Sequence, residues 1–342
     1  MEPILVLRIA KTVIGLFGIL GNGLVCLVIY RVKEMHSLTN GLICNQAAID
    51  FLSCLFMLLH SNIPNPPSVP SGLAGKLYCQ LWIAPVMLFS LLVASTFSLI
   101  SITLERYVAI VYPFQYLILF TRRKTIVLIC CVWIVAFGYK LNDMARYDME
   151  NGHCVTKTVS WKTALGLVQF CVQYFLPLSV MMFAYGHIMI MLRKSEQATA
   201  RNVGSTFQNR GPAQARQSDA SQANNEVTSS TAPVAESLSQ GLRRARQNTF
   251  KTLLIVYLAF LVCWTPNQFI FLFWNLGLPV DNSSVVYRLT TIMASSNSAI
   301  NFIIYALKYR QFRRGVRRLF GCPNDIDVAA TTYTHNSVVP VK

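Results

Sequence analysis

One carboxylate stands in a stretch of sequence that should exclude it. Asp50 lies in "ICNQAAIDFLSCLFML", well inside an apolar run long enough to cross a membrane as a helix. An Asp at the centre of such a helix costs at least about 2.5–3.5 kcal/mol. Asp50 therefore indicates either a cation or proton site inside a helix bundle, or a protonated carboxyl that hydrogen-bonds to a neighbouring helix.

Polar residues at similar depth in other apolar runs could complete a site around Asp50. Asn297, Asn301 and Tyr305 are spaced by four, so they share one helical face. Carboxylate, hydroxyl and amide oxygens are the ligands that a hard cation such as Na⁺ prefers. Each polar residue alone could equally hold two helices together. The candidates for the cluster are Asn22, Asp50, Ser95, Asn297, Ser298 and Asn301.

Two prolines interrupt later apolar runs. Pro177 lies in "QYFLPLSVMMFAYGH" and Pro266 in "FLVCWTPNQF", with Trp264 and Phe260 just before the second. Proline removes a backbone donor and clashes with the preceding turn, which usually kinks a helix. Each kink could be static or could serve as a hinge, and the aromatic pair would lie beside the second.

The sequence "ERY" at 105–107 ends the third apolar run next to basic residues. Glu105 and Arg106 could be an interfacial ion pair and nothing more. Cys79 and Cys154 fall in expected outer segments, so a disulfide between them is predicted. The sequon at Asn282 is the one expected outside the membrane.

The elements that position these residues are membrane helices. Hydrophobic residues make up 54% of the 342 residues, charged residues only 13%, and the mean hydropathy is +0.44. A soluble domain usually has about 25% charged residues. The formal charge is +16, but the basic residues fall between apolar runs, which argues against nucleic-acid binding. The runs are roughly 5–30, 39–61, 79–107, 124–142, 161–192, 249–276 and 284–307.

We therefore predict an all-α membrane protein, a seven-transmembrane helix bundle with a short amphipathic eighth helix in "KYRQFRRGVRRLFGC". An N-terminus outside places 22 of the 30 basic residues on the inner side or at its border, as the positive-inside rule requires. Residues 1–320 would form the bundle, with a disordered cytoplasmic loop at 195–245, and 321–342 a cytoplasmic tail. Cys322 beside the basic helix suggests palmitoylation and contact with membrane lipids.

Together these positions resemble the rhodopsin-like (class A) G-protein-coupled receptors, and the invertebrate neuropeptide and orphan receptors among them. The match extends from Asn22 to about residue 320. Its members occur in family order at near-family spacing: "GN" at 21–22, Asp50, Cys79, "ERY" at 105–107, Trp133, Cys154, Pro177 with Tyr185, "CWTP" at 263–266 and "NFIIY" at 301–305.

The resemblance implies roles for the matching residues. Asp50, Ser95, Asn297, Ser298 and Asn301 match the family's allosteric sodium site, and no other cofactor is required. Arg106 would face a heterotrimeric G protein when the cytoplasmic side opens, and arrestin is a further expected partner. The residues implied in activation and coupling are Glu105, Arg106, Tyr107, Pro113, Tyr185, Phe260, Pro266 and Tyr305.

Several positions depart from the family pattern. Phe302 replaces the usual Pro of the seventh-helix motif; it keeps its backbone N–H, so we expect a more regular helix over 298–305. Cys79 lies 27 residues before Arg106 where 25 is typical, which predicts a bulged or longer outer third helix. Arg246 stands where some members place an acidic partner for the motif arginine, leaving Glu105 as its restraint.

The ligand class follows from the same comparison. Amine receptors need a carboxylate on the outer third helix, but the candidate positions are Leu88 and Val86, and Ser295 replaces the lysine that binds retinal. A short amidated neuropeptide is the first choice. Charges in the outer segments are mixed, so the ligand's charge stays open. The pocket would be lined by Leu88, Gln169, Gln173, Trp264, Asn267, Gln268, Phe271, Trp274, Tyr287 and Arg288.

Other classes are weaker. A transporter or channel would show repeats and paired broken helices, which are not visible. An enzyme would need a nucleophile–base pair, a metal motif or a phosphate loop, and none is seen. A receptor for a lipid or small metabolite is the main alternative to a peptide receptor, and a constitutively active receptor without a ligand is another.

Overall fold

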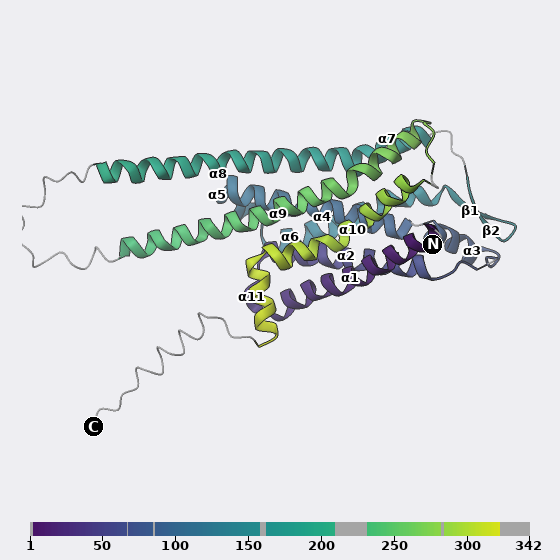
Figure 1. Ribbon diagram of the computed structural model, residues 1–342, viewed down its shortest axis with the longest axis horizontal. Helices are drawn as coiled ribbons and strands as arrows, with labels where there is room; N and C mark the ends of the chain where they lie inside the picture. The colour runs from purple at the N-terminus through teal and green to yellow at the C-terminus, as the bar shows by residue number, and fades with distance from the viewer. Residues whose placement is uncertain are drawn as a thin grey trace, which may run out of the picture.

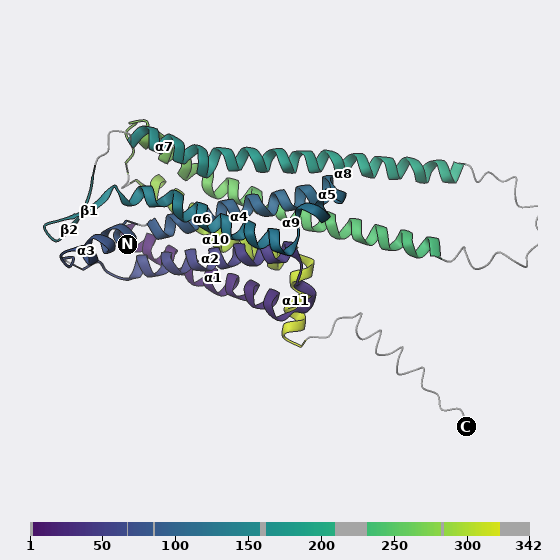
Figure 2. The same cartoon turned by 180° about the vertical axis from the view of Figure 1, so that it is seen from behind.

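The computed structural model describes residues 3–66, 68–84, 86–157, 162–208, 231–281 and 284–321, and of 195–208 and 231–249 the backbone only. Long helices run roughly parallel along one axis (Figure 1). A small hairpin lies at one end, and helix α11 crosses the other end beside α1, as the reverse view also shows (Figure 2). These are called the hairpin end and the α11 end below.

The bundle is built as the sequence predicts. Within the described residues, six helices are long and apolar enough to cross a membrane. The seventh, α10, lies against α9, α1 and α2, and it is less apolar because its inward face holds the Ser and Asn residues of the candidate site. The helices of the bundle are α1 (Pro3–Arg31), α2 (Leu38–Asn62), α4 (Val86–Val111), α6 (Arg122–Met144), α7 (Lys162–Phe170) with α8 (Leu176–Gln208), α9 (Thr231–Asn275) and α10.

Short elements complete the fold. Ser37 and Ser284 cap α2 and α10 by accepting from the backbone N–H of Asn40 and Tyr287, each at 3.2 Å. The remaining helices are η1 (Lys33–Met35), α3 (Leu73–Tyr78), η2 (Cys79–Ile83), α5 (Pro113–Leu119), η3 (Cys171–Phe175) and α11 (Arg310–Leu319), and α10 spans Val285–Lys308. The amphipathic α11 buries Phe312 and Gly315 and exposes its arginines, as expected for the eighth helix.

The two prolines are accommodated differently. Just before Pro177, residues Cys171–Phe175 form a turn of π-helix (η3) that joins α7 to α8. A wider turn leaves room for the proline ring against the preceding carbonyls. Pro266 instead lies inside the continuous helix α9. Beside it, the Thr265 hydroxyl donates to the Leu261 carbonyl and also contacts the hydroxyl of Tyr174, at 2.6 Å.

The hairpin end is tied together covalently. Strands β1 (Tyr147–Glu150) and β2 (His153–Thr156) pair antiparallel through a turn at Asn151 and Gly152, both with positive φ. Cys154 on β2 forms the predicted disulfide with Cys79. Cys79 begins the π-helical turn η2, and the chain leaves the helix at Ala84 before α4 begins at Val86, so the outer end of the third span is irregular, as the spacing to Arg106 predicts. The hairpin itself is not part of the sequence prediction, although "NG" at 151–152 is a strong hairpin signal.

The predicted disordered loop, 195–245, lies partly outside the described residues, at 209–230, and its edges are helical. The segment 195–245 was expected to be a disordered loop, but α8 continues to Gln208 and α9 begins at Thr231. The two helices extend side by side well beyond the rest of the bundle at the α11 end (Figure 1). Glu196, Gln197, Ala198, Ala200 and Arg201 have high helix propensity and favour continuation of α8 even without an apolar period. Asn282, Cys322 and the tail to 342 lie outside the described residues.

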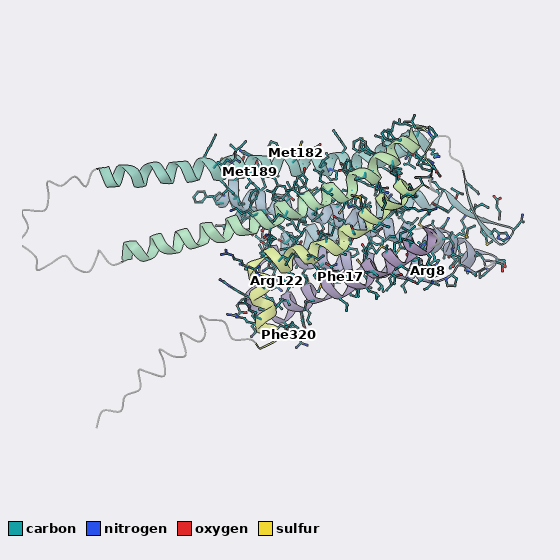
Figure 3. All side chains as sticks on the ribbon, in the orientation of Figure 1. Arg8, Phe17, Arg122, Met182, Met189 and Phe320 are labelled. Carbon is teal, nitrogen blue, oxygen red and sulfur yellow. A yellow bond between two sulfur atoms is a disulfide. The ribbon has the colours of Figure 1, made fainter. Side chains whose placement is uncertain are left out.

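Apolar side chains on the outer faces of the helices are exposed, as a lipid-facing surface requires. Met182 and Met189 on α8 are 62% and 39% exposed and lie along the outer edge of the bundle (Figure 3). Phe17 on α1 is 51% exposed. Buried polar residues lie between the helices among the apolar core, so the bundle is apolar on its outer surface as well as inside.

Phe302 is fitted into a notch on α1. Helix α10 is an uninterrupted α-helix through 298–305, as the backbone N–H of Phe302 allows. The Phe302 ring lies over Gly21, where an added Cβ would come within 2.1 Å of Phe302 Cδ1. The ring of Phe17 lies 5.0 Å from it, centroid to centroid. Gly21 therefore serves close packing of α1 on α10 rather than a special backbone conformation.

This packing gives a test by complementary substitutions. Gly21→Val is expected to lower the thermal stability of the purified receptor, because overpacking of a filled interface typically costs about 1–3 kcal/mol. Adding Phe302→Ala should restore part of the loss, since the ring that blocks the new side chain is gone. Melting temperatures of the two single variants and the double variant measure the coupling. Strictly additive losses would contradict this assignment.

Candidate functional site

The Asp50 carboxylate is fully buried and receives three hydrogen bonds. Ser95 Oγ on α4 donates to Oδ1 at 2.9 Å, and Asn301 Nδ2 on α10 donates to Oδ2 at 2.8 Å. Gln46 Nε2, one turn earlier on α2, donates to Oδ2 at 3.1 Å and to Ser95 Oγ at 2.6 Å. Three helices thus meet at one carboxylate, which compensates part of the cost of burying it.

The atoms around Asp50 that have no hydrogen-bond partner are all oxygens. They are Asn22 Oδ1, Gln46 Oε1, Asn297 Oδ1, Ser298 Oγ, Asn301 Oδ1 and, further along α10, Tyr305 Oη. Together with a carboxylate they provide neutral and anionic oxygen donors, the set that a hard monovalent cation favours. The residues present therefore fit a sodium ion.

The sequence-predicted members of this cluster have different roles. Asn301 and Ser95 bind Asp50 directly, and Ser298 faces the carboxyl. Asn297 is buried but makes no hydrogen bond to Asp50 in the described part of the chain. Asn22 instead ties α1 to α10, donating to the Ser298 carbonyl at 2.9 Å.

Gln46 was not predicted. Its position four residues before Asp50 puts it on the same helical face, which is the signal that could have found it. The side chain is fully buried, and its amide N–H group already hydrogen-bonds one oxygen of the Asp50 carboxylate.

A cavity of about 460 Å³ opens between the helices at the hairpin end. Nine of the ten predicted pocket residues line it: Leu88, Gln169, Gln173, Trp264, Asn267, Gln268, Phe271, Trp274 and Tyr287. Arg288 is not among the lining residues, because it follows Tyr287 on α10 and faces another direction. Trp264 packs beside Phe260 on the same helix, with ring centroids 5.9 Å apart and the rings tilted by 33°.

Four charged residues that sequence reasoning did not assign to the pocket also line it. Lys140 lies near the end of the predicted run 124–142 and Asp143 just beyond it; α6 extends to Met144, and both residues line the cavity. Lys140 Nζ lies 2.9 Å from Asp143 Oδ2, and Arg146 NH1 lies 4.0 Å from Asp143 Oδ1. Lys11 on α1 is the fourth, and it makes no hydrogen bond or ion pair in the described part of the chain.

The acidic hairpin residue Asp148 is also already paired. Lys157 donates to its carboxylate, and Lys76 Nζ lies 3.9 Å away. The neighbouring ammonium of Lys157 holds the pKa of Asp148 below its usual value. The stabilisation from this pair is present above the unfolded-state pKa of Asp and is lost as the pH falls through the lowered value.

At the α11 end, Arg106 is held by a buried carboxylate. The Arg106 guanidinium donates to both oxygens of Glu105, which is fully buried, and also to the Thr39 hydroxyl. Thr39 Oγ1 and Tyr116 Oη donate to Glu105 Oε1 at 3.0 and 2.8 Å. Glu105 therefore restrains Arg106, and residues of α2 and α5 in turn hold the Glu105 carboxylate in place.

The other predicted activation residues surround this pair. Tyr185 on α8 is buried and its hydroxyl lies 3.1 Å from Thr103 Oγ1. Tyr107 points outward to His187 Nδ1, at 2.9 Å. Pro113 begins α5, where its fixed φ suits the first turn of a helix. Arg246 lies among the residues whose side chains are not described.

A membrane-spanning helix bundle with a cavity at its disulfide-linked end and a restrained arginine at the other has the organisation of a transmembrane receptor. The family model of the 7 transmembrane receptors (rhodopsin family) matches residues 21–305. The chain belongs to this family of class A G-protein-coupled receptors, and it is a receptor rather than an enzyme.

Curated relatives are similar along most of their length. Galanin receptor 2a of Danio rerio is 24% identical over 326 residues, covering 93% of this chain and 78% of that protein. Human histamine H2 receptor is 26% identical over 324 residues, with 92% and 79% covered. The allatostatin-A receptor of Bombyx mori is 25% identical over 324 residues, with 91% and 78% covered. At about 25% identity these relatives support the receptor class, but their names include receptors for peptides and a receptor for an amine, so they do not identify the ligand class.

Proposed function

We propose that this receptor binds a short extracellular neuropeptide in the cavity at the hairpin end and promotes nucleotide exchange on a heterotrimeric G protein at the α11 end. The hairpin end would face the exterior, which the disulfide and the positive-inside distribution both support. The protein would act in the plasma membrane with its N-terminus outside and its C-terminus in the cytoplasm.

The observation that supports a peptide over an amine is the state of the only carboxylate among the cavity-lining residues. Asp143 is bound by Lys140 and by Gln169 Nε2 at 2.7 Å, with Arg146 nearby, so it is not free to pair with a ligand ammonium. Leu88 and Val86, the two candidate positions on α4 for the carboxylate of an amine receptor, are both apolar. Amides and aromatics fill the rest of the lining, and these suit the backbone and side chains of a peptide.

The mechanism follows from the elements that connect the two ends. A ligand in the cavity contacts Trp264, which packs on Phe260 along α9. Proline 266 removes one backbone hydrogen bond beside them, so α9 bends most easily there. Movement of α9 at its far end would open the cytoplasmic side and release Arg106 from Glu105. The ligand drives this change only through its preference for the open state.

A sodium ion at the Asp50 cluster is proposed as an allosteric regulator. When bound, the ion would neutralise Asp50 and stabilise the closed packing of α2, α4 and α10. Asp50, Ser95, Ser298 and Asn301 would hold it, with Asn297 near enough to contribute an oxygen.

The ligand class is testable directly. Screening the receptor in cells against a library of synthetic neuropeptides, with G-protein dissociation as the readout, should yield short peptides that act at submicromolar concentration. Activation should disappear when Trp264 is replaced by Ala, because the base of the cavity is lost. Activation only by lipids or small metabolites would replace the peptide assignment with the non-peptide alternative.

A further inference from the structure

The buried polar atoms of the cavity that lack a hydrogen-bond partner are all donors. Among the cavity-lining residues, the buried side-chain atoms without a partner are Arg146 Nε, Gln173 Nε2 and Trp264 Nε1. The nitrogens of Arg146 and Trp264 can only donate. Around Asp50, by contrast, the unpartnered atoms are amide and hydroxyl oxygens, all of which can accept.

The net charge of the cavity lining also favours an anionic ligand. Its lining contains three cations, Lys11, Lys140 and Arg146, and one carboxylate, Asp143. With His60 neutral, the excess is two positive charges. Asp143 already neutralises Lys140, and the hairpin carboxylate Asp148 is paired with Lys157 outside the cavity.

Lys11 is the cation without compensation. Its side chain is partly buried between α1 and α2 and lines the cavity, with His60 nearby. Among described residues it has no acceptor within hydrogen-bonding distance, whereas the neighbouring Arg8 binds Asn62. A partly desolvated ammonium without a counter-ion is unfavourable, and an anionic ligand group would remove that cost.

We infer that the ligand carries an anionic group, an acidic side chain or a free C-terminal carboxylate, that pairs with Lys11. Arg146 and Trp264 then receive acceptor oxygens from the rest of the ligand. This inference rests on the proposed peptide function and narrows it: an amidated peptide without an acidic residue would not satisfy Lys11.

The probe is a matched peptide set. Each active peptide from the library is made with every Asp or Glu replaced by Asn or Gln, and with its C-terminus as acid or amide. Removing the anionic group should lower potency about tenfold or more, the usual loss for a charge-assisted hydrogen bond. Lys11→Met should lower the potency of the anionic peptide by a similar factor and leave the neutral one unchanged.

Two further variants act as controls. Lys11→Arg keeps the charge and should retain the preference for the anionic peptide. Lys76→Met removes a positive charge from the same end without touching the cavity and should have no effect, since Lys76 is half exposed on the hairpin side. If Lys11→Met does not reach the surface, Lys11→Gln replaces it, and surface labelling normalises every response.

The outcomes separate the two proposals. Active peptides that are neutral or cationic and insensitive to Lys11→Met would overturn the anionic-ligand inference while leaving the peptide receptor intact. Peptides that all fail, with anionic lipids or metabolites acting through Lys11, would overturn the peptide function and leave the anionic site standing.

Discussion

Arg106→Ala is expected to abolish ligand-stimulated nucleotide exchange while leaving ligand binding measurable. Arg106 lies at the α11 end, far from the cavity, so the ligand contacts remain. Its guanidinium offers five donors in a fixed geometry, which suit backbone carbonyls of a partner that enters the open cytoplasmic side. Alanine has none of these donors. Binding of a non-hydrolysable GTP analogue to purified G protein, in the presence of receptor, measures the effect.

The matched variant is Glu105→Gln, which keeps the shape and removes the charge that restrains Arg106. Hydrogen bonds to a charged group contribute about 1.5–3 kcal/mol, so losing the pair should raise basal exchange by roughly ten- to 150-fold at most. Thr39→Val should raise it less, since Glu105 still binds Arg106. Unaltered exchange in Arg106→Ala would remove the assigned role, and unaltered basal exchange in Glu105→Gln would show that another contact restrains the closed state.

Much of this architecture is predictable because a membrane imposes a simple rule on sequence. The cost of a charge in hydrocarbon makes Asp50 conspicuous, and the same cost confines Lys and Arg to the ends of the runs. Helix periodicity then places Asn301 on the face that meets Asp50, and α10 does present Asn301 there. Positions such as these are determined by local sequence and the membrane together.

The site residues that the sequence did not predict depend on where the helices end and on how each helix is rotated about its axis. Asp143 belongs to the cavity because α6 continues past the predicted end at 142 to Met144, and periodicity does not fix a helix end. Arg288 sits one residue beyond a lining position, a rotation of 100° that turns it away from the cavity. Gln46 is a different case: its spacing of four from Asp50 is visible in the sequence, but only the meeting of α2 with α4 gives it a second partner in Ser95.

If sodium binds at the Asp50 cluster, replacing Asp50 should remove the stabilisation by sodium, and replacing Gln46 should increase it. Sodium stabilises the receptor only if it binds the folded state, by an amount that grows with the logarithm of its concentration; at ten times the dissociation constant this is about 1.4 kcal/mol. Asp50→Asn should abolish the difference in melting temperature between sodium chloride and choline chloride at equal ionic strength, because the single negative charge of the cluster is gone.

Gln46→Leu should have the opposite effect. The Gln46 amide donates to Asp50 Oδ2, a position on the carboxylate that an ion would otherwise neutralise. Leucine keeps the volume and removes the donor, so the carboxylate should bind sodium more tightly: the variant is less stable in choline chloride and gains more from sodium chloride than the wild-type receptor. Sodium dependence that persists in Asp50→Asn would exclude the cation site. Sodium dependence that is lost in Gln46→Leu would mean that the Gln46 side-chain oxygen is a ligand of the ion, and that its amide rotates to face the ion when sodium binds.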